Sequence, residues 1–280
     1  MTIAAGFVHS DGILLCSDSQ MESMLGKTEG PKIGVFDFAG GKVAIAFAGH
    51  KENALNAVQK CAKTLKRLGE HEDAIAELES TLDTAYQRLV YRDPKYKTSE
   101  ENNIGYSLLI AFWSKRDNRA SLFATEGVAL NGVTTPCECR GIGRDLANYI
   151  VGPLASETLS EQQALVLAAY VLGRVKYGVP GCGGVSQFVS LRNDGIVVSV
   201  TDLVLDEVDR ISRIFDTESQ HLLFTMANPD QAQFETQLDA FVASMREIRR
   251  YWVTFQSNVT SSKYQRLTTT DQSSQPPSRE

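Results

Sequence analysis

The second residue of the chain, Thr2, carries a hydroxyl that could act as a nucleophile if Met1 were removed. We expect this removal because threonine is small, and it would leave a free α-amine on the residue that carries the hydroxyl. An α-amine has an unperturbed pKa of about 7.7–8.0, so a large fraction of it can act as a base near neutral pH. One residue would then supply both nucleophile and general base, as in N-terminal threonine enzymes.

Three residues in the segments that follow could assist Thr2. Asp18 ends the returning strand of a predicted hairpin, and antiparallel pairing would bring that end back to the start of the chain. Lys32 precedes the next predicted strand, where it could pair with Asp18 and lower the pKa of the Thr2 hydroxyl. Gly49 lies between a strand and a helix, so its backbone N–H is a candidate oxyanion donor. Singly, each residue has an ordinary explanation as a turn, a cap or a solvated charge; together they predict a catalytic set.

The elements that would position this set follow from hydrophobic periodicity. Apolar runs broken by turn residues predict strands at 3–8, 13–17, 33–38, 42–48, 106–113, 120–125, 128–130, 188–191 and 196–200. Helical spacing predicts helices at 55–68, at 75–89, at 144–151 and from Ser160, where Ser160 and Gln163 fit a capping box. Two sheets packed together, with helices outside both, would bury all of these apolar faces in an α+β fold.

The chain changes character after residue 200. Residues 201–256 show only helical periodicity, and an apolar stripe from Phe234 to Phe255 must cover the main domain or a neighbouring subunit. Pro229 suits the first turn of that second helix. Residues 257–280 are rich in Ser, Thr and Gln, which predicts a disordered tail.

Composition excludes several function classes. The 280 residues are 42% apolar and 22% charged, as in an ordinary soluble globular protein. The net charge of −6, without a local Lys/Arg run, argues against a nucleic-acid partner. We expect no membrane span and no secretory signal, and five scattered cysteines do not form a disulfide framework. A cytoplasmic location is therefore predicted.

Two sequence blocks carry a resemblance to a known family. The chain resembles a mature proteasome β subunit, an N-terminal nucleophile hydrolase, in Thr2-Ile3-Ala4-Ala5-Gly6, Asp11-Gly12-Ile13-Leu14-Leu15-Cys16-Ser17-Asp18-Ser19, Pro31-Lys32-Ile33, Ala44-Ile45-Ala46-Phe47-Ala48-Gly49, Cys182-Gly183-Gly184 and Phe188-Val189-Ser190-Leu191-Arg192-Asn193-Asp194-Gly195. Gln20 is closer to the bacterial ATP-dependent relative of the proteasome than to eukaryotic subunits. The C-terminal helices resemble an elaboration found in the ancestral bacterial proteasome-like family.

This resemblance implies a fold, an activity and an assembly. It covers residues 2–200 as a hydrolase domain and implies a four-layer αββα sandwich, to which 201–256 adds a helical extension. It implies a threonine-type peptidase that acts on peptides or unfolded proteins inside a homo-oligomeric ring or related assembly, without a cofactor or metal. By position, Thr2 is the nucleophile, Asp18 and Lys32 are its charged partners, and Gly49 is the oxyanion donor. An ATPase partner is left open.

The sequence departs from the family pattern at three supporting positions. Val179 replaces an Asp, Cys182 replaces a Ser, and Ile142 replaces the Ser between two glycines. The family's groups there hold the α-amine and relay its proton. Two alternatives therefore stay open: a non-catalytic, ring-forming subunit, and an N-terminal nucleophile amidase that acts on a small amide.

Other possible sites are weaker. Cys137-Glu138-Cys139 lacks a second Cys or His pair within easy reach, so we expect no zinc site. Gly141-Ile142-Gly143 lacks the third glycine of a dinucleotide-binding loop and is interpreted as a turn into a helix. Cys182 has no nearby His that could activate it, so we expect a small buried residue under the site.

Overall fold

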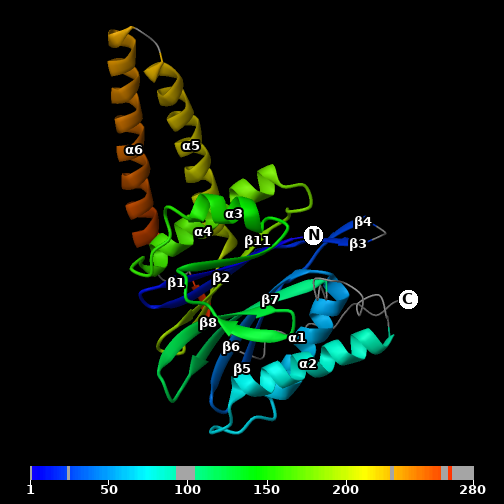
Figure 1. Ribbon diagram of the computed structural model, residues 1–280. Coiled ribbons are helices and arrows are strands. Elements are labelled where there is room, and N and C mark those ends of the chain that lie inside the picture. Colours follow the sequence, from blue (N-terminus) through cyan, green and yellow to red (C-terminus); the bar gives the residue numbers. More distant parts are fainter. Residues whose placement is uncertain (1, 24–25, 93–104, 228–229, 260–263, 267–280) are drawn as a thin grey trace, which may run out of the picture. The chain divides into compact units, whose positions relative to one another are not determined.

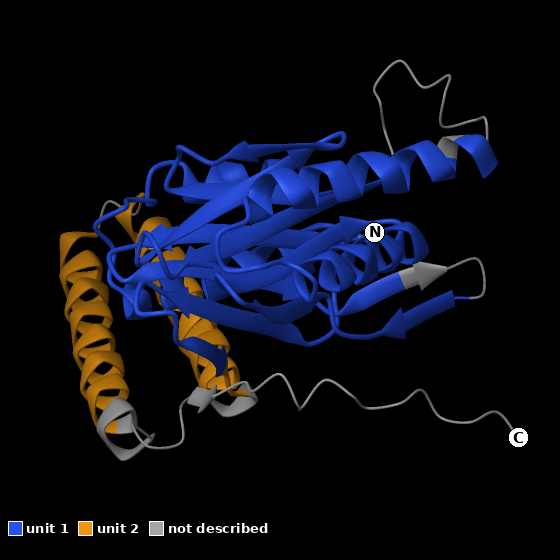
Figure 2. Ribbon diagram, turned by 90° about the horizontal axis from the view of Figure 1, so that it is seen from below, with its two compact units in different colours: residues 1–199, 266–280 blue, residues 200–265 orange. Residues whose placement is uncertain are grey.

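A computed structural model describes residues 2–23, 26–92, 105–227, 230–259 and 264–266. The chain forms two compact units, one of residues 1–199 with 266–280 and one of residues 200–265 (Figure 2). The predicted division into 2–200, 201–256 and 257–280 stays a prediction, and most of that predicted tail lies outside the described residues.

In the first sheet of the larger unit, the first two strands of the chain lie between strands that are far from them in the sequence. Its order is β10-β1-β2-β11-β12, antiparallel throughout. Its strands β1, β2 and β11 are labelled in Figure 1. The strands are β1 (Ile3–His9), β2 (Gly12–Asp18), β10 (Cys137–Gly141), β11 (Ser186–Arg192) and β12 (Val197–Val200). β1 and β2 form the predicted hairpin, because both are apolar runs and Gly12 has a φ of +152° at the turn.

The second sheet follows the order of the chain. It consists of β5 (Ile33–Phe38), β6 (Gly41–Gly49), β7 (Tyr106–Ser114), β8 (Arg119–Glu126) and β9 (Ala129–Gly132), with every neighbouring pair antiparallel. These five strands lie where the apolar periodicity predicts them. A separate hairpin of β3 (Gln20–Ser23) and β4 (Gly26–Glu29), and the strand β10, were not predicted.

Two apolar clusters hold the larger unit together. One lies between the sheets and includes Ala4, Leu15 and Leu109, and the other joins the second sheet to two helices. Those helices are α1 (Lys51–Leu65) and α2 (Ala74–Arg92). On the first sheet, α4 (Glu161–Gly178) packs against β1 and β2, and α3 (Arg144–Val151) packs against α4 and β10. The predicted α+β class is therefore confirmed, as is the capping box of Ser160 and Gln163.

The smaller unit contains a pair of packed helices, α5 (Asp202–Met226) and α6 (Gln231–Val259). The short strand β13 (Tyr264–Arg266) follows α6 in the chain, and the division between the two units falls within it. The Arg210 guanidinium of α5 lies 4.9 Å from the centre of the Tyr251 ring of α6. Pro229, predicted in the first turn of α6, lies outside the described residues. Among the helices that the structure describes, none is both long and apolar enough to cross a membrane.

Candidate active site

The β1–β2 hairpin brings Thr2 and Asp18 together. Thr2 immediately precedes β1, Asp18 ends β2, and the register pairs Ala4 with Ser17. The Asp18 carboxylate then reaches the first residues of the chain, where its Oδ1 accepts a hydrogen bond from the Ile3 N–H at 3.1 Å. The same oxygen accepts a hydrogen bond from the Thr2 hydroxyl. One tight turn therefore brings together Thr2 and Asp18, which are 16 positions apart in the sequence.

Lys32 completes a buried network with these two residues. Its Nζ lies 2.7 Å from Asp18 Oδ1 and also donates to Thr2 Oγ1 and to the Gln20 carbonyl oxygen. The three residues are 2%, 0% and 1% exposed in the order Thr2, Asp18 and Lys32. The structure thus brings Thr2, Asp18 and Lys32 into contact, and their roles as nucleophile and charged partners stay predictions.

The electrostatics of the network are set by burial and by one ion pair. Burial lowers the pKa of Lys32 from its ordinary value of 10.5, while the hydrogen bond and the charge of Asp18 oppose that shift. A buried ammonium is costly unless it is paired and hydrogen-bonded, and Asp18 supplies the pairing. The positive charge that remains beside Thr2 Oγ1 favours the alkoxide form of this hydroxyl.

Two segments that are distant in the sequence, one through its backbone and one through a side chain, hold the two charged partners in place. The Gly183 N–H donates to Asp18 Oδ2 at 2.9 Å, and the Gln20 N–H donates back to the Gly183 carbonyl at 3.0 Å. The Gln187 amide accepts from the Lys32 N–H at 2.8 Å and donates to the Gly30 carbonyl at 3.2 Å. Gly183 and Gln187 therefore act as positioning residues. Gln187 was missed by sequence reasoning, and only the Gly183-Gly184 pair gave a signal there.

Gly49 has a backbone that suits its predicted role. The His50 N–H donates to the Gly105 carbonyl at 2.6 Å, so Gly49 and Tyr106 form a non-hydrogen-bonded pair of the antiparallel ladder. The Gly49 N–H consequently points away from β7. Its φ is +102°, and a side-chain carbon would lie 2.3 Å from the Gly105 carbonyl oxygen, so only glycine fits. Oxyanion donation by this N–H stays a prediction.

The end of β10 fixes the backbone of Thr2. The Ile142 N–H donates to the Thr2 carbonyl at 3.1 Å, and Gly141 has a φ of +97°. A side-chain carbon on Gly141 would lie 2.1 Å from that carbonyl oxygen. Gly143 caps α3, which agrees with the predicted turn into a helix. β10 therefore contributes to the site through its backbone.

Replacing Gly141 by Ala is expected to destabilise the chain by about 2 kcal/mol or more, because it adds a clash to a backbone conformation that L-residues avoid. The free energy of unfolding, measured with urea, checks this. Gly132→Ala is the matched control, since its new carbon would meet nothing closer than Phe123 Cε1 at 3.9 Å. Equal stabilities of the two variants would contradict the described end of β10.

The three departures from the family pattern are each placed by the structure. Ile142 is 42% exposed, and Val179 is the extended residue that ends α4. Cys182 is buried, as expected, at 6% exposure. Burial, and then the charge of Asp18, raise the pKa of the Cys182 thiol to about 11. This thiol is therefore a poor nucleophile at neutral pH.

Alkylation of Cys182 by iodoacetamide at neutral pH should be slower in the native chain than in the urea-unfolded chain by roughly two orders of magnitude. Iodoacetamide reacts with the thiolate form of cysteine. Because the pKa of Cys182 is raised to about 11, the native chain contains a smaller fraction of thiolate at neutral pH than the unfolded chain does. Mass spectrometry of the Cys182 peptide over time gives both rates. Equal rates would show that the thiol is not protected by the fold.

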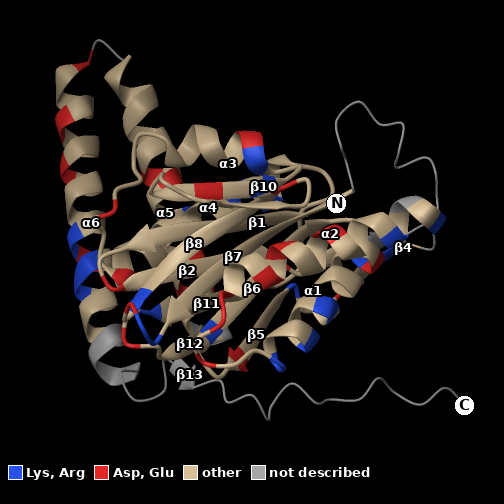
Figure 3. Ribbon diagram, turned by 60° about the horizontal axis from the view of Figure 1, so that its bottom comes forward, with Lys and Arg blue, Asp and Glu red and all other residues tan. Residues whose placement is uncertain are grey.

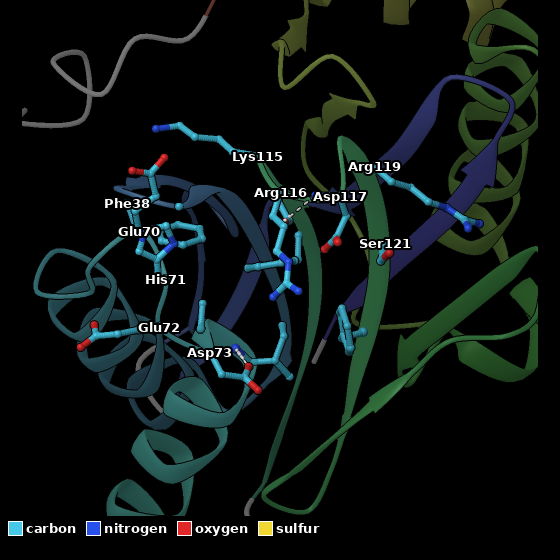
Figure 4. A pocket seen from close by; sticks show the side chains of 16 residues that line it. Phe38, Glu70, His71, Glu72, Asp73, Lys115, Arg116, Asp117, Arg119 and Ser121 are labelled. Atoms are coloured by element: carbon cyan, nitrogen blue, oxygen red, sulfur yellow. Dashed lines mark hydrogen bonds between the residues drawn. The ribbon is translucent and has the colours of Figure 1, made fainter.

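Two further features of the described residues, a pair of cysteines on β10 and a cavity, lie outside this network. Cys137 and Cys139 have sulfur atoms 3.7 Å apart on β10, but no group of three or more potential ligands surrounds a metal position in the described part of the chain. A cavity of about 920 Å³ lies between the β5–β6 turn, the β7–β8 turn and the loop before α2 (Figure 4). It opens at the Gly40 end of β6, roughly 27 Å along the strand from Gly49, and contains none of the predicted catalytic residues.

Comparison with solved structures identifies the fold. Neither a protein-family model nor a curated protein sequence matches this chain. It is similar to Anbu from Hyphomicrobium sp. strain MC1 in a Gly-1 mutant (TM-score 0.66, 12% identity, 81% of this chain and 99% of that chain). The chain has the fold of the Anbu proteins. Anbu (ancestral beta-subunit) from Yersinia bercovieri gives a TM-score of 0.64 at 13% identity, covering 81% of this chain and 97% of that one.

A third structure is the helical assembly of the Anbu complex from Pseudomonas aeruginosa (TM-score 0.67, 14% identity, 82% of this chain and 99% of that chain). These findings correct the resemblance to proteasome β subunits. Anbu proteins are proteasome-like but form a distinct family, so the short motifs shared with β subunits reflect a common fold and do not fix the family. At 12–14% identity the likeness to Anbu shows the fold alone.

Proposed function

We propose that this protein hydrolyses peptide or amide bonds with Thr2 as its N-terminal nucleophile after removal of Met1. The observation that carries the proposal is the buried contact of Thr2 Oγ1 with both Lys32 Nζ and Asp18 Oδ1. A solvent-excluded cation beside a hydroxyl lowers the pKa of that hydroxyl more than an exposed cation would. An assembly subunit without chemistry gains no evident benefit from such a buried charge, which is costly to maintain.

The first half of the reaction forms an ester. Before processing, the nitrogen of Thr2 is an amide and cannot act as a base; after processing it is an amine. The amine takes the proton from Thr2 Oγ1, assisted by the positive charge of Lys32, and the oxygen attacks the substrate carbonyl carbon. The resulting oxyanion accepts a hydrogen bond from the Gly49 N–H. When the carbon–nitrogen bond breaks, the Thr2 ammonium returns the proton to the leaving amine.

The second half of the reaction releases the acid. The acyl group is then bound to Thr2 Oγ1 as an ester, and the neutral α-amine takes a proton from an attacking water. The tetrahedral intermediate collapses, the carbon–Oγ1 bond breaks, and Oγ1 recovers the proton. Asp18 keeps Lys32 oriented throughout, since its Oδ1 is bound by the Lys32 ammonium and its Oδ2 by the Gly183 N–H.

The same proposal includes the architecture and assembly. The packing of α1 and α2, the two sheets, and α3 and α4 supports the four-layer αββα sandwich. The Anbu complex from Pseudomonas aeruginosa forms a helical assembly, which supports a homo-oligomer here as well. Peptides or unfolded proteins in a cytoplasmic setting are the proposed substrates, and an ATPase partner is left open.

One observation favours the second candidate, a non-catalytic subunit of the same assembly. The positions that would support the α-amine carry Ile142 and Val179, whose side chains offer no hydrogen bond. In this case the buried network would have no chemical role. An amidase that acts on a small amide would share the Thr2 chemistry and differ only in its substrate.

Two measurements on the native chain separate these functions. Intact-mass spectrometry should give a mass lower than that of the full sequence by one methionine residue, and retained Met1 would overturn the proposal. Turnover is then followed with a mixture of fluorogenic peptides and with small aliphatic amides. Turnover of peptides supports the peptidase, and turnover of small amides alone supports the amidase. If the chain turns over neither kind of substrate, the result supports the non-catalytic subunit.

A further inference from the structure

An aromatic floor underlies the cavity of about 920 Å³ at the Gly40 end of the second sheet. Phe112 of β7 stacks on Phe38 of β5 with ring centroids 5.7 Å apart, and it meets Phe123 of β8 edge-on at 6.3 Å. All three rings are half-buried, because α1 and α2 cover only the neighbouring part of this sheet face. Aromatic rings favour a further ring beside them in stacked or edge-to-face contact. The floor therefore suits an aromatic part of a ligand.

The walls of the cavity are held in place by their own hydrogen bonds. In the loop before α2, the Glu72 carboxylate accepts from the Gly69 N–H at 2.6 Å, and Asp73 caps the first turn of the helix. In the β7–β8 turn, Lys115 Nζ donates to the Ala39 carbonyl at 2.5 Å. Both walls are thus formed before any ligand binds, which reduces the ordering entropy that binding would cost.

Two charged side chains of the cavity are left without a partner. Within the described residues, neither the Arg116 guanidinium nor the Glu70 carboxylate takes part in an ion pair or a hydrogen bond. Glu70 belongs to the loop before α2 and Arg116 to the β7–β8 turn. In Figure 4 the Arg116 side chain extends into the space between these two segments. The cavity therefore offers one free charge of each sign, on two different walls.

The total charge of the lining argues against a ligand with several phosphates. Acidic lining residues outnumber basic ones, with Glu70, Glu72, Asp73 and Asp117 against Lys115, Arg116 and Arg119. Charges of both signs also continue along α1 and α2 outside the cavity (Figure 3). A polyphosphate would be repelled by the acidic wall, whereas a zwitterion can pair with each sign of charge separately.

We infer that this cavity is a binding site for an aromatic amino acid or for a short peptide that contains one. The ligand carboxylate binds Arg116, because a planar guanidinium offers two parallel N–H donors to a carboxylate. The ligand ammonium pairs with Glu70, and the ligand ring packs on the aromatic floor. The volume of about 920 Å³ falls in the range of about 300–1,000 Å³ that is typical of small-molecule sites. The cavity contains none of the predicted catalytic residues, so this inference does not depend on the proposed function.

A series of small ligands tests the inference on the native chain. Isothermal titration calorimetry with the dipeptide alanyl-phenylalanine should show saturable binding. Three relatives each lack one recognised group: alanyl-alanine lacks the ring, alanyl-phenylalanine amide the carboxylate, and N-acetyl-alanyl-phenylalanine the ammonium. Each should bind roughly tenfold or more weakly. Free phenylalanine distinguishes the two sources of the ligand, because binding as tight as that of the dipeptide indicates the amino acid and weaker binding indicates a short peptide.

Variants of the cavity locate the binding. Arg116→Gln should weaken the binding of alanyl-phenylalanine roughly tenfold or more. It should leave the weaker binding of the amide unchanged, because that ligand has no carboxylate for Arg116 to bind. Glu70→Gln should likewise weaken the binding of the dipeptide and not that of its N-acetyl form. The matched control is Arg67→Gln, which changes an exposed arginine outside the cavity and should bind the dipeptide as wild type does. Thermal melting shows whether each variant is folded.

Two results would overturn the inference. One is the absence of binding for both alanyl-phenylalanine and free phenylalanine at millimolar concentration. The other is equal binding of the dipeptide by folded Arg116→Gln and Arg67→Gln variants. Equal binding would place the dipeptide at another site, such as the candidate active site at the opposite end of β6.

Discussion

Replacement of Thr2 by Val is expected to reduce amide or peptide hydrolysis by roughly 10³-fold or more. Val preserves the branched shape of the side chain and still permits removal of Met1, but it lacks Oγ1. Without this oxygen no ester can form, and Lys32 and Asp18 lose the group that they contact together. Steady-state kinetics on whichever substrate the wild type cleaves, with the N-terminus checked by intact mass, measures the effect.

Thr2→Ser is the matched control for that variant. It retains the hydroxyl and the neighbouring amine while removing one methyl group, so part of the activity should persist. Because the network of Lys32 and Asp18 is buried, both variants must also be compared in thermal melting. If Thr2→Val is folded, processed and as active as wild type, the hydrolysis arises elsewhere and Thr2 is not its nucleophile.

Separation of the buried ion pair gives the largest expected change in stability. Lys32→Met leaves the Asp18 carboxylate buried without its cation, and Asp18→Asn leaves the ammonium without its anion. Each change should cost about 3–5 kcal/mol of unfolding free energy, because an unpaired buried charge is strongly unfavourable. Urea titration followed by fluorescence or circular dichroism gives these values. Both variants should also lose turnover, since the charge beside Thr2 Oγ1 is removed or misplaced.

The double variant with Asp18→Asn and Lys32→Met separates stability from activity. It removes both charges at once, so its stability should return to within about 1–2 kcal/mol of wild type. Its activity should remain low, because no cation lies beside the hydroxyl. If the two single changes were merely additive in stability, the residues would not be paired in the folded chain.

The pH dependence of Asp18→Asn follows from the pKa of Lys32. Burial already lowers this pKa, and Asp18 is the main influence that raises it, so the variant lowers it further. Below its lowered pKa, Lys32 is charged in the folded variant, and burial of this charge destabilises the fold to its full extent. This destabilisation decreases as the pH rises through the lowered pKa towards 10.5, the ordinary pKa of Lys. The stability deficit of Asp18→Asn should therefore narrow as the pH rises through the lowered pKa of Lys32 towards 10.5. Lys32→Met has no amine at this position and should show no such narrowing.

Local sequence signals account for the part of the site that one hairpin builds. Asp11-Gly12 between two apolar runs fixes the β1–β2 register, and this register determines that Asp18 returns to Thr2. Lys32 was predictable because it precedes a clear strand. Gly49 ends β6 shortly before α1, and the change from alternating to helical periodicity marks that junction in the sequence.

Tertiary contacts account for what the sequence did not predict. β10 has the sequence Cys-Glu-Cys-Arg-Gly, which lacks apolar alternation, and it exists because it pairs with the distant strand β1, with Gly141 opposite Ile3. Gln187 reaches Lys32 over a separation of 155 residues. Short motifs also proved too general for a family assignment, because the similar solved structures are Anbu proteins, which are distinct from proteasome β subunits.

The most direct test of Thr2 as an N-terminal nucleophile is the reaction of the native chain with a peptide α′,β′-epoxyketone. This reagent forms a ring adduct only where one residue offers both a hydroxyl and a free α-amine. Tandem mass spectrometry should locate one adduct, on the N-terminal peptide that begins at Thr2, and the Thr2→Val variant should remain unlabelled. A folded chain that keeps Met1, or one that has lost Met1 and still forms no adduct at Thr2, would contradict the claim that Thr2 is an N-terminal nucleophile.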